Sequence, residues 1–217
     1  MCGAASITLR KPRSKNEIIN DLNSEVTSFF SVLRDRPLEL RLKLRDTPYG
    51  RDEYALAREP SEDPLEQARR TIVKSWFGIG DSLDNKTGFR VSLSQAGSTT
   101  APWLTYVDYL HLYAERLRGV IIENLDYFEI IERYDKTDTL FYFDPPYLTQ
   151  TRSKKHAYKF DWKDADHQRL VDALKTVKGH WILSGYDSEV YDSLDARKIT
   201  FEAATQFGHR TETLWIK

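Results

Sequence analysis

The tetrapeptide Asp144-Pro145-Pro146-Tyr147 combines residue types that could hold a planar amine. It directly follows the apolar residues 140–143, which are typical of a strand. Two consecutive prolines fix φ twice and supply no N–H donor, so the turn is stiff and its carbonyl groups stay free to accept hydrogen bonds. The Asp144 carboxylate and the Pro145 carbonyl could accept the two hydrogens of a ring –NH₂ group, and Tyr147 could stack on that ring. A plain turn that ends a strand is the alternative.

Short apolar runs predict the strands that would position such a site. They lie at residues 17–20, 120–122, 139–143 and 181–183, and a final pair at 198–201 and 211–216 predicts an antiparallel edge. Helical spacing of the apolar residues between them predicts helices that begin near Ser24, Asp126 and Asp164, with Ser24 and Asp164 as N-caps. Strands that alternate with helices favour an α/β fold with a mainly parallel sheet covered on both faces.

Acidic residues that follow predicted strands are the first candidates for a ligand site, because ligands bind at the carboxyl ends of strands in such sheets. These residues are Asp21, Asp126, Asp144 and Asp187. The two prolines after Asp144 distinguish it from the other three, so we take Asp144 as the decisive residue among them.

The middle of the chain departs from the alternation of strands and helices. Residues 42–102 are rich in charged and turn residues, with a helix-like piece at 65–76 and a Gly/Ser/Thr stretch at 78–100. A chain of 217 residues is about one and a half times a typical domain of roughly 150 residues. We therefore expect one domain made of residues 1–41 and 103–217, with residues 42–102 inserted as a small, mostly helical subdomain.

The overall charge indicates no particular partner. Lys and Arg number 32 against 33 Asp and Glu, so the net charge is −1 and any surface for nucleic acid must be local. A basic loop directly after the tetrapeptide is the best such candidate, and a solvated loop is the alternative. Its residues are Arg152, Lys154, Lys155, Tyr158 and Lys159.

The sequence also disfavours several kinds of site. The single cysteine, Cys2, allows no intramolecular disulfide and no Cys-based zinc site, and the five histidines show no ligand spacing, so we expect no metal. No stretch is apolar enough to cross a membrane, and the first residues do not form a secretory signal, so we expect no membrane partner. This cysteine usage favours a cytoplasmic localisation.

Five motifs, in order along the chain, resemble those of the Dam-type (alpha-group) N6-adenine-specific DNA methyltransferases, which use S-adenosylmethionine. They lie at residues 17–23, 123–127, 141–147, 182–187 and 210–215. The resemblance implies a Rossmann-like methyltransferase fold. Its mixed sheet would be mostly parallel with an antiparallel C-terminal edge, and the inserted residues 42–102 would recognise the target sequence.

The resemblance also implies a role for each matching residue. Gly3 would belong to the turn that borders the cofactor, Asp21 would bind its ribose region, and Leu22 would pack against its adenine. Asp126 would accept a hydrogen bond from the adenine amine of the cofactor, with Tyr127 beside it. In the catalytic motif, Asp144 and the Pro145 carbonyl would hold the target amine next to the cofactor, Pro146 would stiffen the turn, and Tyr147 would stack on the flipped base.

The implied reaction transfers a methyl group from S-adenosylmethionine to the N6 amine of adenine in duplex DNA, by base flipping and direct displacement. The implied partner is double-stranded DNA, while a restriction endonuclease partner, the recognition sequence and the oligomeric state are left open. The basic loop would contact phosphates. Weaker candidates for DNA contact are Arg69, Arg70, Lys74, Lys86 and Arg90 in the inserted region, and Arg10, Lys11, Arg13 and Lys15 near the N-terminus.

One motif of the family is incomplete in this sequence. Residues 1–6 resemble the first cofactor turn, but the strand that precedes this turn in the family is absent. We therefore expect an N-terminally shortened form in which the first strand is missing or incomplete, with weak or no binding of S-adenosylmethionine. Because that strand lies in the middle of the family's sheet, its neighbours would expose unpaired N–H and C=O groups.

Two other interpretations stay open at this point. The chain could be a truncated, inactive nucleic-acid-binding remnant that keeps the basic loop. It could also be a methyltransferase that acts on another planar amine, such as a glutamine amide or an RNA base. Relatives of the latter kind more often carry Asn at the position of Asp144 and lack a large insertion, so the sequence argues against it.

Overall fold

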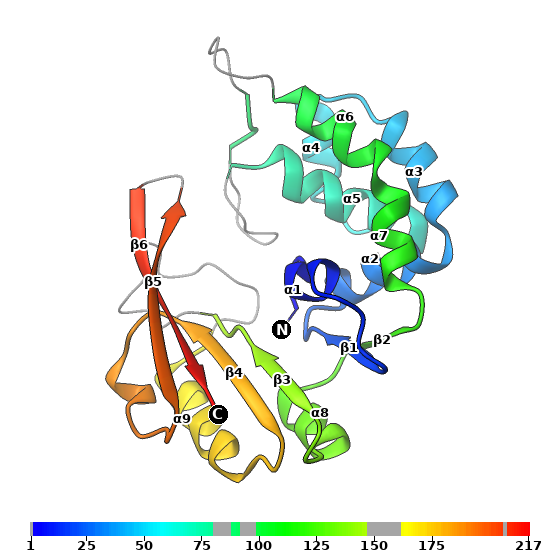
Figure 1. Ribbon diagram of the computed structural model, residues 1–217. Coiled ribbons are helices and arrows are strands. Elements are labelled where there is room, and N and C mark those ends of the chain that lie inside the picture. Colours follow the sequence, from blue (N-terminus) through cyan, green and yellow to red (C-terminus); the bar gives the residue numbers. More distant parts are fainter. Residues whose placement is uncertain (1, 80–87, 92–98, 147–161, 206–207) are drawn as a thin grey trace. The chain divides into compact units, whose positions relative to one another are not determined.

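The computed structural model describes residues 2–79, 88–91, 99–146, 162–205 and 208–217, and these residues form helices and strands in a mixed α/β arrangement (Figure 1). The helices are α1 (Ser6–Arg10), α2 (Ser24–Asp35), α3 (Pro37–Arg45), α4 (Arg51–Leu56), α5 (Pro64–Phe77), α6 (Thr100–Asp108), α7 (Leu110–Leu117), α8 (Tyr127–Tyr134), α9 (Asp164–Thr176) and the 3₁₀ helix η1 (Glu189–Tyr191). The strands are β1 (Glu17–Asn20), β2 (Val120–Glu123), β3 (Leu140–Phe143), β4 (His180–Gly185), β5 (Arg197–Thr205) and β6 (Gly208–Ile216). The chain divides into two compact units at residues 124 and 125, which we call the N-terminal and the C-terminal unit.

The N-terminal unit packs a two-stranded parallel sheet against helices. β1 and β2 pair in the register Glu17 with Val120 to Asn20 with Glu123. The helices bury one shared apolar core, which includes Phe29, Leu33, Leu40, Leu44, Phe77 and Leu110. Leu44 and Phe77 lie within residues 42–102, whereas the other four lie outside that range. The helices of the predicted insertion therefore share a core with α2, α3 and α7, and target recognition by residues 42–102 stays a prediction.

Local signals explain where the helices of the N-terminal unit begin. α2 has Asn23 as its N-cap, and the side chain of this residue accepts a hydrogen bond from the backbone N–H of Glu25 at 3.0 Å. The prediction that Ser24 caps this helix was wrong by one residue, because the side chain of Asn23 is the one that reaches a free N–H of the first turn. In α5, Asp63 caps the helix and Pro64 occupies its first turn, where a missing N–H costs nothing.

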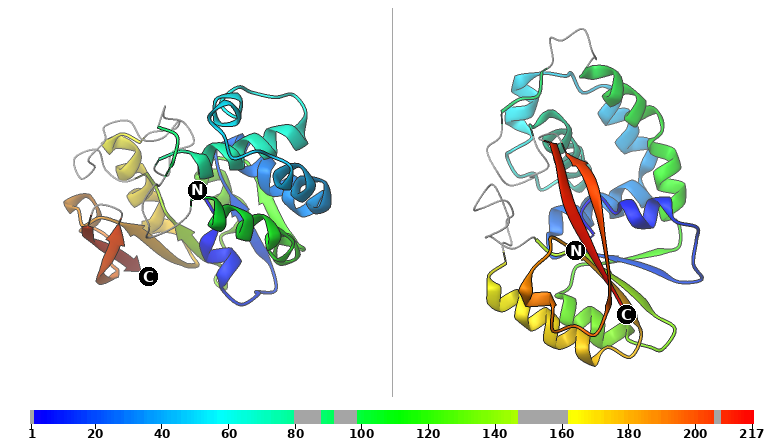
Figure 2. Two further views of the ribbon diagram at one scale, coloured as in Figure 1. Left: turned by 90° about the horizontal axis from the view of Figure 1, so that it is seen from above. Right: turned by 60° about the vertical axis from the view of Figure 1, so that its left-hand side comes forward.

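The C-terminal unit contains a four-stranded sheet in the order β3-β4-β6-β5. β3 and β4 are parallel, whereas β4–β6 and β6–β5 are antiparallel, which confirms the predicted antiparallel C-terminal edge. The hairpin of β5 and β6 continues past the end of β4, because β4 pairs only with residues 213–216 of β6 (Figure 2). Helices α8 and α9 pack on the face that carries Phe141, Phe143, Trp181, Leu183 and Trp215.

A tight turn before β4 sets the register of β3 and β4. The carboxylate of Asp135 accepts hydrogen bonds from the backbone N–H groups of Lys178 and Gly179, at distances from 2.9 to 3.0 Å. A Cβ atom at Gly179 would lie 2.5 Å from the carbonyl oxygen of Lys136, so this close approach requires glycine. The turn thereby aligns Leu140 with His180 and fixes the point at which β3 ends.

α9 begins after Lys163 and not after a cap at Asp164, because Lys163 occupies the N-cap position and Asp164 is already helical.

The described strands form two sheets and not the single sheet that the sequence predicted. β1 pairs only with β2, and β3 pairs only with β4, among the described residues. Residues 2–16 contain the short helix α1 and no strand. One edge of β1 and one edge of β3 are therefore without a neighbouring strand in the described part of the chain.

Candidate active site

Asp144 lies directly at the carboxyl end of β3. The strand alternates in burial, so Phe141 and Phe143 enter the core while Tyr142 points to the other face. Pro145 is buried and Pro146 is partly buried, which anchors the turn after the strand. The side chain of Asp144 thus leaves the end of a strand that is held by its neighbours on one face and by β4 along one edge.

The protein environment makes Asp144 a stronger base than an ordinary aspartate. Asp144 keeps contact with solvent, but the protein around its carboxyl group removes enough water to raise its pKa from 3.8 to about 6. The nearby carboxylate of Glu212 adds to this increase. Perturbed carboxyl groups of this kind gather at reactive sites, which favours a chemical role for Asp144.

Other polar side chains lie near Asp144 on β3, β4 and β6. The hydroxyl of Tyr142 forms a hydrogen bond with the side chain of Ser184, and burial raises the pKa of this tyrosine. Ser184 is buried on this face. Thr213 is buried on the opposite face, which carries Trp215, and its hydroxyl has no hydrogen-bond partner among the described residues. The sequence reasoning gave no role to Ser184 or Glu212, because only the pairing of β4 with β6 brings them to the end of β3.

Asp126 begins α8 in the same unit. Its Oδ1 atom accepts a hydrogen bond from the backbone N–H of Phe128 at 2.9 Å, so it is the N-cap of the helix. None of the described residues donates a hydrogen bond to the other carboxylate oxygen. Asp126 therefore has one oxygen that organises the helix and one that a ligand amine could use.

Tyr127 follows Asp126 within an aromatic cluster. Its ring lies 4.6 Å from the ring of Phe128 and 5.3 Å from that of Trp162, measured between centroids. Burial raises the pKa of Tyr127 to about 12, and its buried hydroxyl has no hydrogen-bond partner among the described residues. The guanidinium of Arg169 lies 4.0 Å over the ring of Phe128 and closes the outer side of the cluster.

Gly3, Asp21 and Leu22 lie together in the N-terminal unit. The Oδ2 atom of Asp21 accepts hydrogen bonds from the backbone N–H groups of Cys2 and Gly3, both at 3.0 Å. Its Oδ1 atom accepts a third from Asn23 at 2.9 Å. Gly3 has a φ of +47°, a conformation that favours glycine, and no atom lies within 4 Å of where its Cβ would be. Asp21 therefore fixes the turn at residues 2–3 and retains one acceptor position on Oδ1.

Leu22 and Asn124 complete this cluster. Leu22 is exposed, which leaves an apolar side chain free to pack on a flat ring. The side-chain amide of Asn124 donates hydrogen bonds to the backbone carbonyls of Asp21 and Leu22, at 2.7 and 3.1 Å. Sequence reasoning had missed this role of Asn124, because the two segments are far apart in the sequence and meet only through the pairing of β1 with β2.

The remaining predicted site residues lie outside the described residues. They are Tyr147 and the whole basic loop, Arg152, Lys154, Lys155, Tyr158 and Lys159. Their predicted contacts with a flipped base and with phosphates stay predictions.

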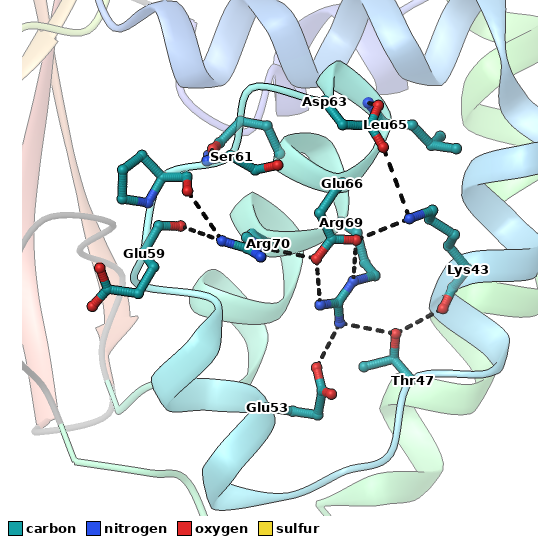
Figure 3. A network of polar contacts seen from close by, with 12 residues as sticks. Lys43, Thr47, Glu53, Glu59, Ser61, Asp63, Leu65, Glu66, Arg69 and Arg70 are labelled. Atoms are coloured by element: carbon teal, nitrogen blue, oxygen red, sulfur yellow. Dashed lines mark hydrogen bonds and ion pairs between the residues drawn. The ribbon is translucent and has the colours of Figure 1, made fainter.

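Two basic residues that were candidates for DNA contact, Arg69 and Arg70, instead belong to an ion-pair network within the N-terminal unit (Figure 3). Arg69 is buried and pairs with Glu53 and Glu66, at 2.7 Å each, while its guanidinium also donates to the hydroxyl of Thr47. Arg70 pairs with Glu66 at 2.9 Å. These cations hold the carboxylate of Glu66, whose pKa falls to about 2 mainly through its hydrogen bond with Arg69. A buried, fully paired guanidinium cannot reach DNA, so the prediction for Arg69 was wrong.

Two further candidates for DNA contact also have partners within the N-terminal unit, and of these only Lys74 is buried, while contact of the exposed Arg13 with DNA stays a prediction. Lys74 is buried and pairs with Glu25 of α2 at 2.6 Å. Arg13 donates hydrogen bonds to the backbone carbonyls of Glu115 and Arg118 at the end of α7, at 2.7 and 2.5 Å. Both cations therefore hold helices of the N-terminal unit in place.

Other basic candidates have structural contacts or lie outside the description. Lys11 pairs with Glu17, which Arg116 also holds through two hydrogen bonds of 2.6 and 2.8 Å. Arg90 donates to the carbonyl of Gly78 at 3.0 Å. Lys86 is not among the described residues.

Two kinds of feature are absent from the described ranges. Within them, no group of three or more His, Cys, Asp or Glu side chains is placed to hold a metal ion. In the same ranges, no helix combines the length and the apolar character needed to cross a membrane.

The fold defines a mixed α/β protein, and the turn after β3 is a candidate ligand site at the carboxyl end of the parallel strands of the C-terminal unit. The sequence model of the D12 class N6 adenine-specific DNA methyltransferase family matches residues 2–206. The chain belongs to this family, which confirms the resemblance found in its motifs.

A curated relative supports the same conclusion. The type II methyltransferase M.MjaIII of Methanocaldococcus jannaschii is 26% identical over 183 residues. The match covers 75% of this chain and 62% of the relative, so the chain spans less than two thirds of the length of that protein.

The family implies S-adenosylmethionine as methyl donor, and the described residues fit parts of this molecule. The second carboxylate oxygen of Asp126 could accept a hydrogen bond from an adenine amine. The buried hydroxyl of Tyr127 has no hydrogen-bond partner among the described residues, and a ligand could supply one. Asp21 keeps one acceptor position for a ribose hydroxyl, and Leu22 offers an exposed apolar surface. Gly3 differs from the expectation in one respect. Its N–H already donates a hydrogen bond to Asp21, so Gly3 offers a ligand only the empty space around its Cβ position.

Proposed function

We propose that this chain carries the catalytic residues of an enzyme that transfers a methyl group from S-adenosylmethionine to the N6 amine of adenine in double-stranded DNA. The observation that supports this most directly is the Asp144-Pro145-Pro146 turn at the end of β3, within the part of the chain that the family model matches. The same family match favours adenine over other planar amines as the target.

Asp144 and Pro145 would prepare the amine for reaction. The lone pair of an adenine amine is delocalised into the ring, which makes the nitrogen a poor nucleophile. Two acceptors, the Asp144 carboxylate and the Pro145 carbonyl, would bind the two hydrogens and favour a pyramidal nitrogen with a localised lone pair. Positioning and electrostatic stabilisation would then supply most of the acceleration, with no covalent bond between enzyme and substrate.

Four residues would hold the methyl donor, which supplies an electrophilic methyl group on a positively charged sulfur. Asp126 would accept a hydrogen bond from the adenine amine of the donor, and the ring of Tyr127 would border that adenine. Asp21 would bind the ribose region, and Leu22 would pack on the adenine ring. The turn at Gly3 would leave room for the donor, because no side chain occupies its Cβ position.

DNA would be held by regions outside the ion-paired helices. The target adenine must leave the duplex to reach Asp144, at a cost of a few kcal/mol. The basic loop of Arg152, Lys154, Lys155, Tyr158 and Lys159 would offset part of this cost through phosphate contacts, and Tyr147 would stack on the flipped base. A cytoplasmic location would give the enzyme access to DNA.

The experiment is transfer of labelled methyl groups from S-adenosylmethionine to duplex DNA, followed by digestion to nucleosides to identify N6-methyladenine. The donor is used at high concentration because weak binding is expected. Asp144→Asn should reduce the rate by about 10²-fold or more, since it removes the charged acceptor at the reacting amine. Asp172→Asn, which removes an exposed carboxylate of α9, is the matched control and should retain the rate.

Two results would decide between this function and the alternatives. Unchanged transfer in Asp144→Asn would show that the catalytic assignment is wrong. Binding of duplex DNA without binding of S-adenosylmethionine in calorimetry, together with no transfer, would identify the chain as an inactive nucleic-acid-binding remnant.

A further inference from the structure

Glu212 lies on the same face of the four-stranded sheet as Asp144. Phe143 is level with Leu183 of β4, so Asp144, one residue later, is level with Ser184. Ser184 pairs with Leu214 of β6, and Glu212 comes two residues before Leu214. Directly paired residues and residues two apart on one strand share a face, so Asp144, Ser184 and Glu212 all point to the same side.

The direction of β6 places Glu212 beyond the end of β3. Because β6 is antiparallel to β4, residues that come earlier in β6 lie further past the carboxyl ends of β3 and β4. This is the end of the sheet at which Asp144 leaves β3. Glu212 is partly buried and has no ion pair among the described residues, so its charge is not neutralised by a described neighbour.

We propose that Glu212 is a positioning residue for the reaction, whose negative charge keeps the Asp144 carboxylate able to take up the proton that the target amine releases. This inference rests on the proposed function. In the reaction, the amine nitrogen forms a bond to the methyl carbon while the carbon–sulfur bond breaks and its electron pair stays on sulfur. The nitrogen, then positively charged, loses one proton to the Asp144 carboxylate, which later gives it to water.

The electrostatics of the cluster agree with this role. The pKa of Asp144 is raised to about 6, mainly by burial of the carboxyl group, and the charge of Glu212 contributes to this increase. Tyr142 of the same face responds to both carboxylates, which also raise its pKa after the larger effect of burial. A base is most effective when its pKa approaches the working pH, so an Asp144 with a pKa of 3.8 would accept the proton less well.

The test measures the proton affinity of Asp144 and the rate of methyl transfer separately. Carboxyl-selective NMR titration of the full chain should give a midpoint near 6 for Asp144. In Glu212→Gln this midpoint should move toward 3.8, and the acid side of the pH profile of single-turnover methylation should move with it. Glu212→Asp keeps the charge and should restore both.

Glu202→Gln is the matched control. Glu202 belongs to the same hairpin, but it pairs in register with Thr211 and accepts a hydrogen bond from the hydroxyl of Thr211 at 2.6 Å, on the face opposite to Glu212. It should leave the midpoint of Asp144 unchanged. A midpoint that does not move in Glu212→Gln, or that moves equally in Glu202→Gln, overturns the inference. The titration needs no methyl transfer, so failure of the inference is distinguishable from failure of the proposed function.

Discussion

At the scale of single residues, Asp144 combines a chemical demand with a cost in stability. In the proposed reaction its carboxylate would be charged when it accepts hydrogens of the amine, yet the surrounding protein disfavours that charge and raises the pKa to about 6. A site that works against the stability of its own residue is typical of residues placed for function.

The first prediction follows from this cost. An unfolded aspartate titrates near 3.8 and folded Asp144 near 6, so between these values the folded state binds more protons than the unfolded state. The contribution of Asp144 to the free energy of unfolding therefore falls as the pH rises through this interval. Asp144→Asn should match the wild type in urea unfolding near pH 3.5 and exceed it at pH 7. A variant that is less stable than the wild type at pH 7 contradicts the raised pKa.

The second prediction concerns the rate of methyl transfer at different pH values. Because protonated Asp144 can no longer offer a charged acceptor, the single-turnover rate should rise with pH through a midpoint near 6 and then level off. Rapid-quench measurements between pH 5 and 8, with donor binding checked at each pH, give this profile. A rate that does not change across pH 6 would show that the ionisation of Asp144 does not control methyl transfer.

At the scale of elements, Arg69 decides how α5 is held. It connects α5 to Glu53 of α4 and to Thr47 in the connection after α3. Such a buried network stabilises less than its number of contacts suggests, because each charge had to leave water. Breaking it by removing one partner is nevertheless costly.

The third prediction is therefore a large loss of stability from Arg69→Met. The change leaves the carboxylates of Glu53 and Glu66 without their main partner in a partly buried place, at a cost of about 3 kcal/mol. Urea unfolding followed by circular dichroism measures it. Arg45→Met is the control, since Arg45 is exposed and, among the described residues, pairs with the adjacent Asp46 alone, so it should change the stability little.

The fourth prediction concerns the start of α2. Asn23→Ala removes the side chain that accepts from the N–H of Glu25, and it should lower the free energy of unfolding by about 1 kcal/mol. Ser24→Ala should cost much less, because the hydroxyl of Ser24 is not the cap. Equal losses in the two variants, measured by urea unfolding, would argue against this assignment of the cap.

At the scale of the whole molecule, each unit has an apolar core of its own. Leu44 is fully buried in the core of the N-terminal unit, and Leu170 is fully buried in the core of the C-terminal unit. A unit that buries its own core can unfold as a separate cooperative step.

The fifth prediction is therefore two transitions in calorimetry, which respond to different substitutions. Leu44→Ala and Leu170→Ala should each destabilise one unit by about 2–5 kcal/mol, through lost burial and the cavity left behind. Each variant should lower one transition temperature and leave the other in place. A single transition that both variants shift alike would show that the units unfold together.

The sequence by itself determined much of the local structure and pointed to the candidate catalytic residue. The strand that leads to Asp144, the proline turn and the antiparallel C-terminal pair were all predicted, because alternating or continuous apolar runs and prolines act over a few neighbouring residues. The family was also predictable, since its motifs are short and lie in a fixed order. The cap of α2 was missed by one residue, because neighbouring Asn and Ser both suit an N-cap and only geometry distinguishes them.

Only the tertiary structure decided which charged residues are used internally. Arg69 and Lys74 resembled a DNA-binding surface in the sequence, yet they pair with Glu53 and Glu25 of other helices. Asp21 meets the backbone of Cys2 and Gly3, and Glu212 reaches the end of β3, through strand pairings that join distant segments. The same pairings separate the strands into two sheets. Partners of this kind depend on register and packing over the whole chain, and for that reason no local pattern in the sequence specifies them.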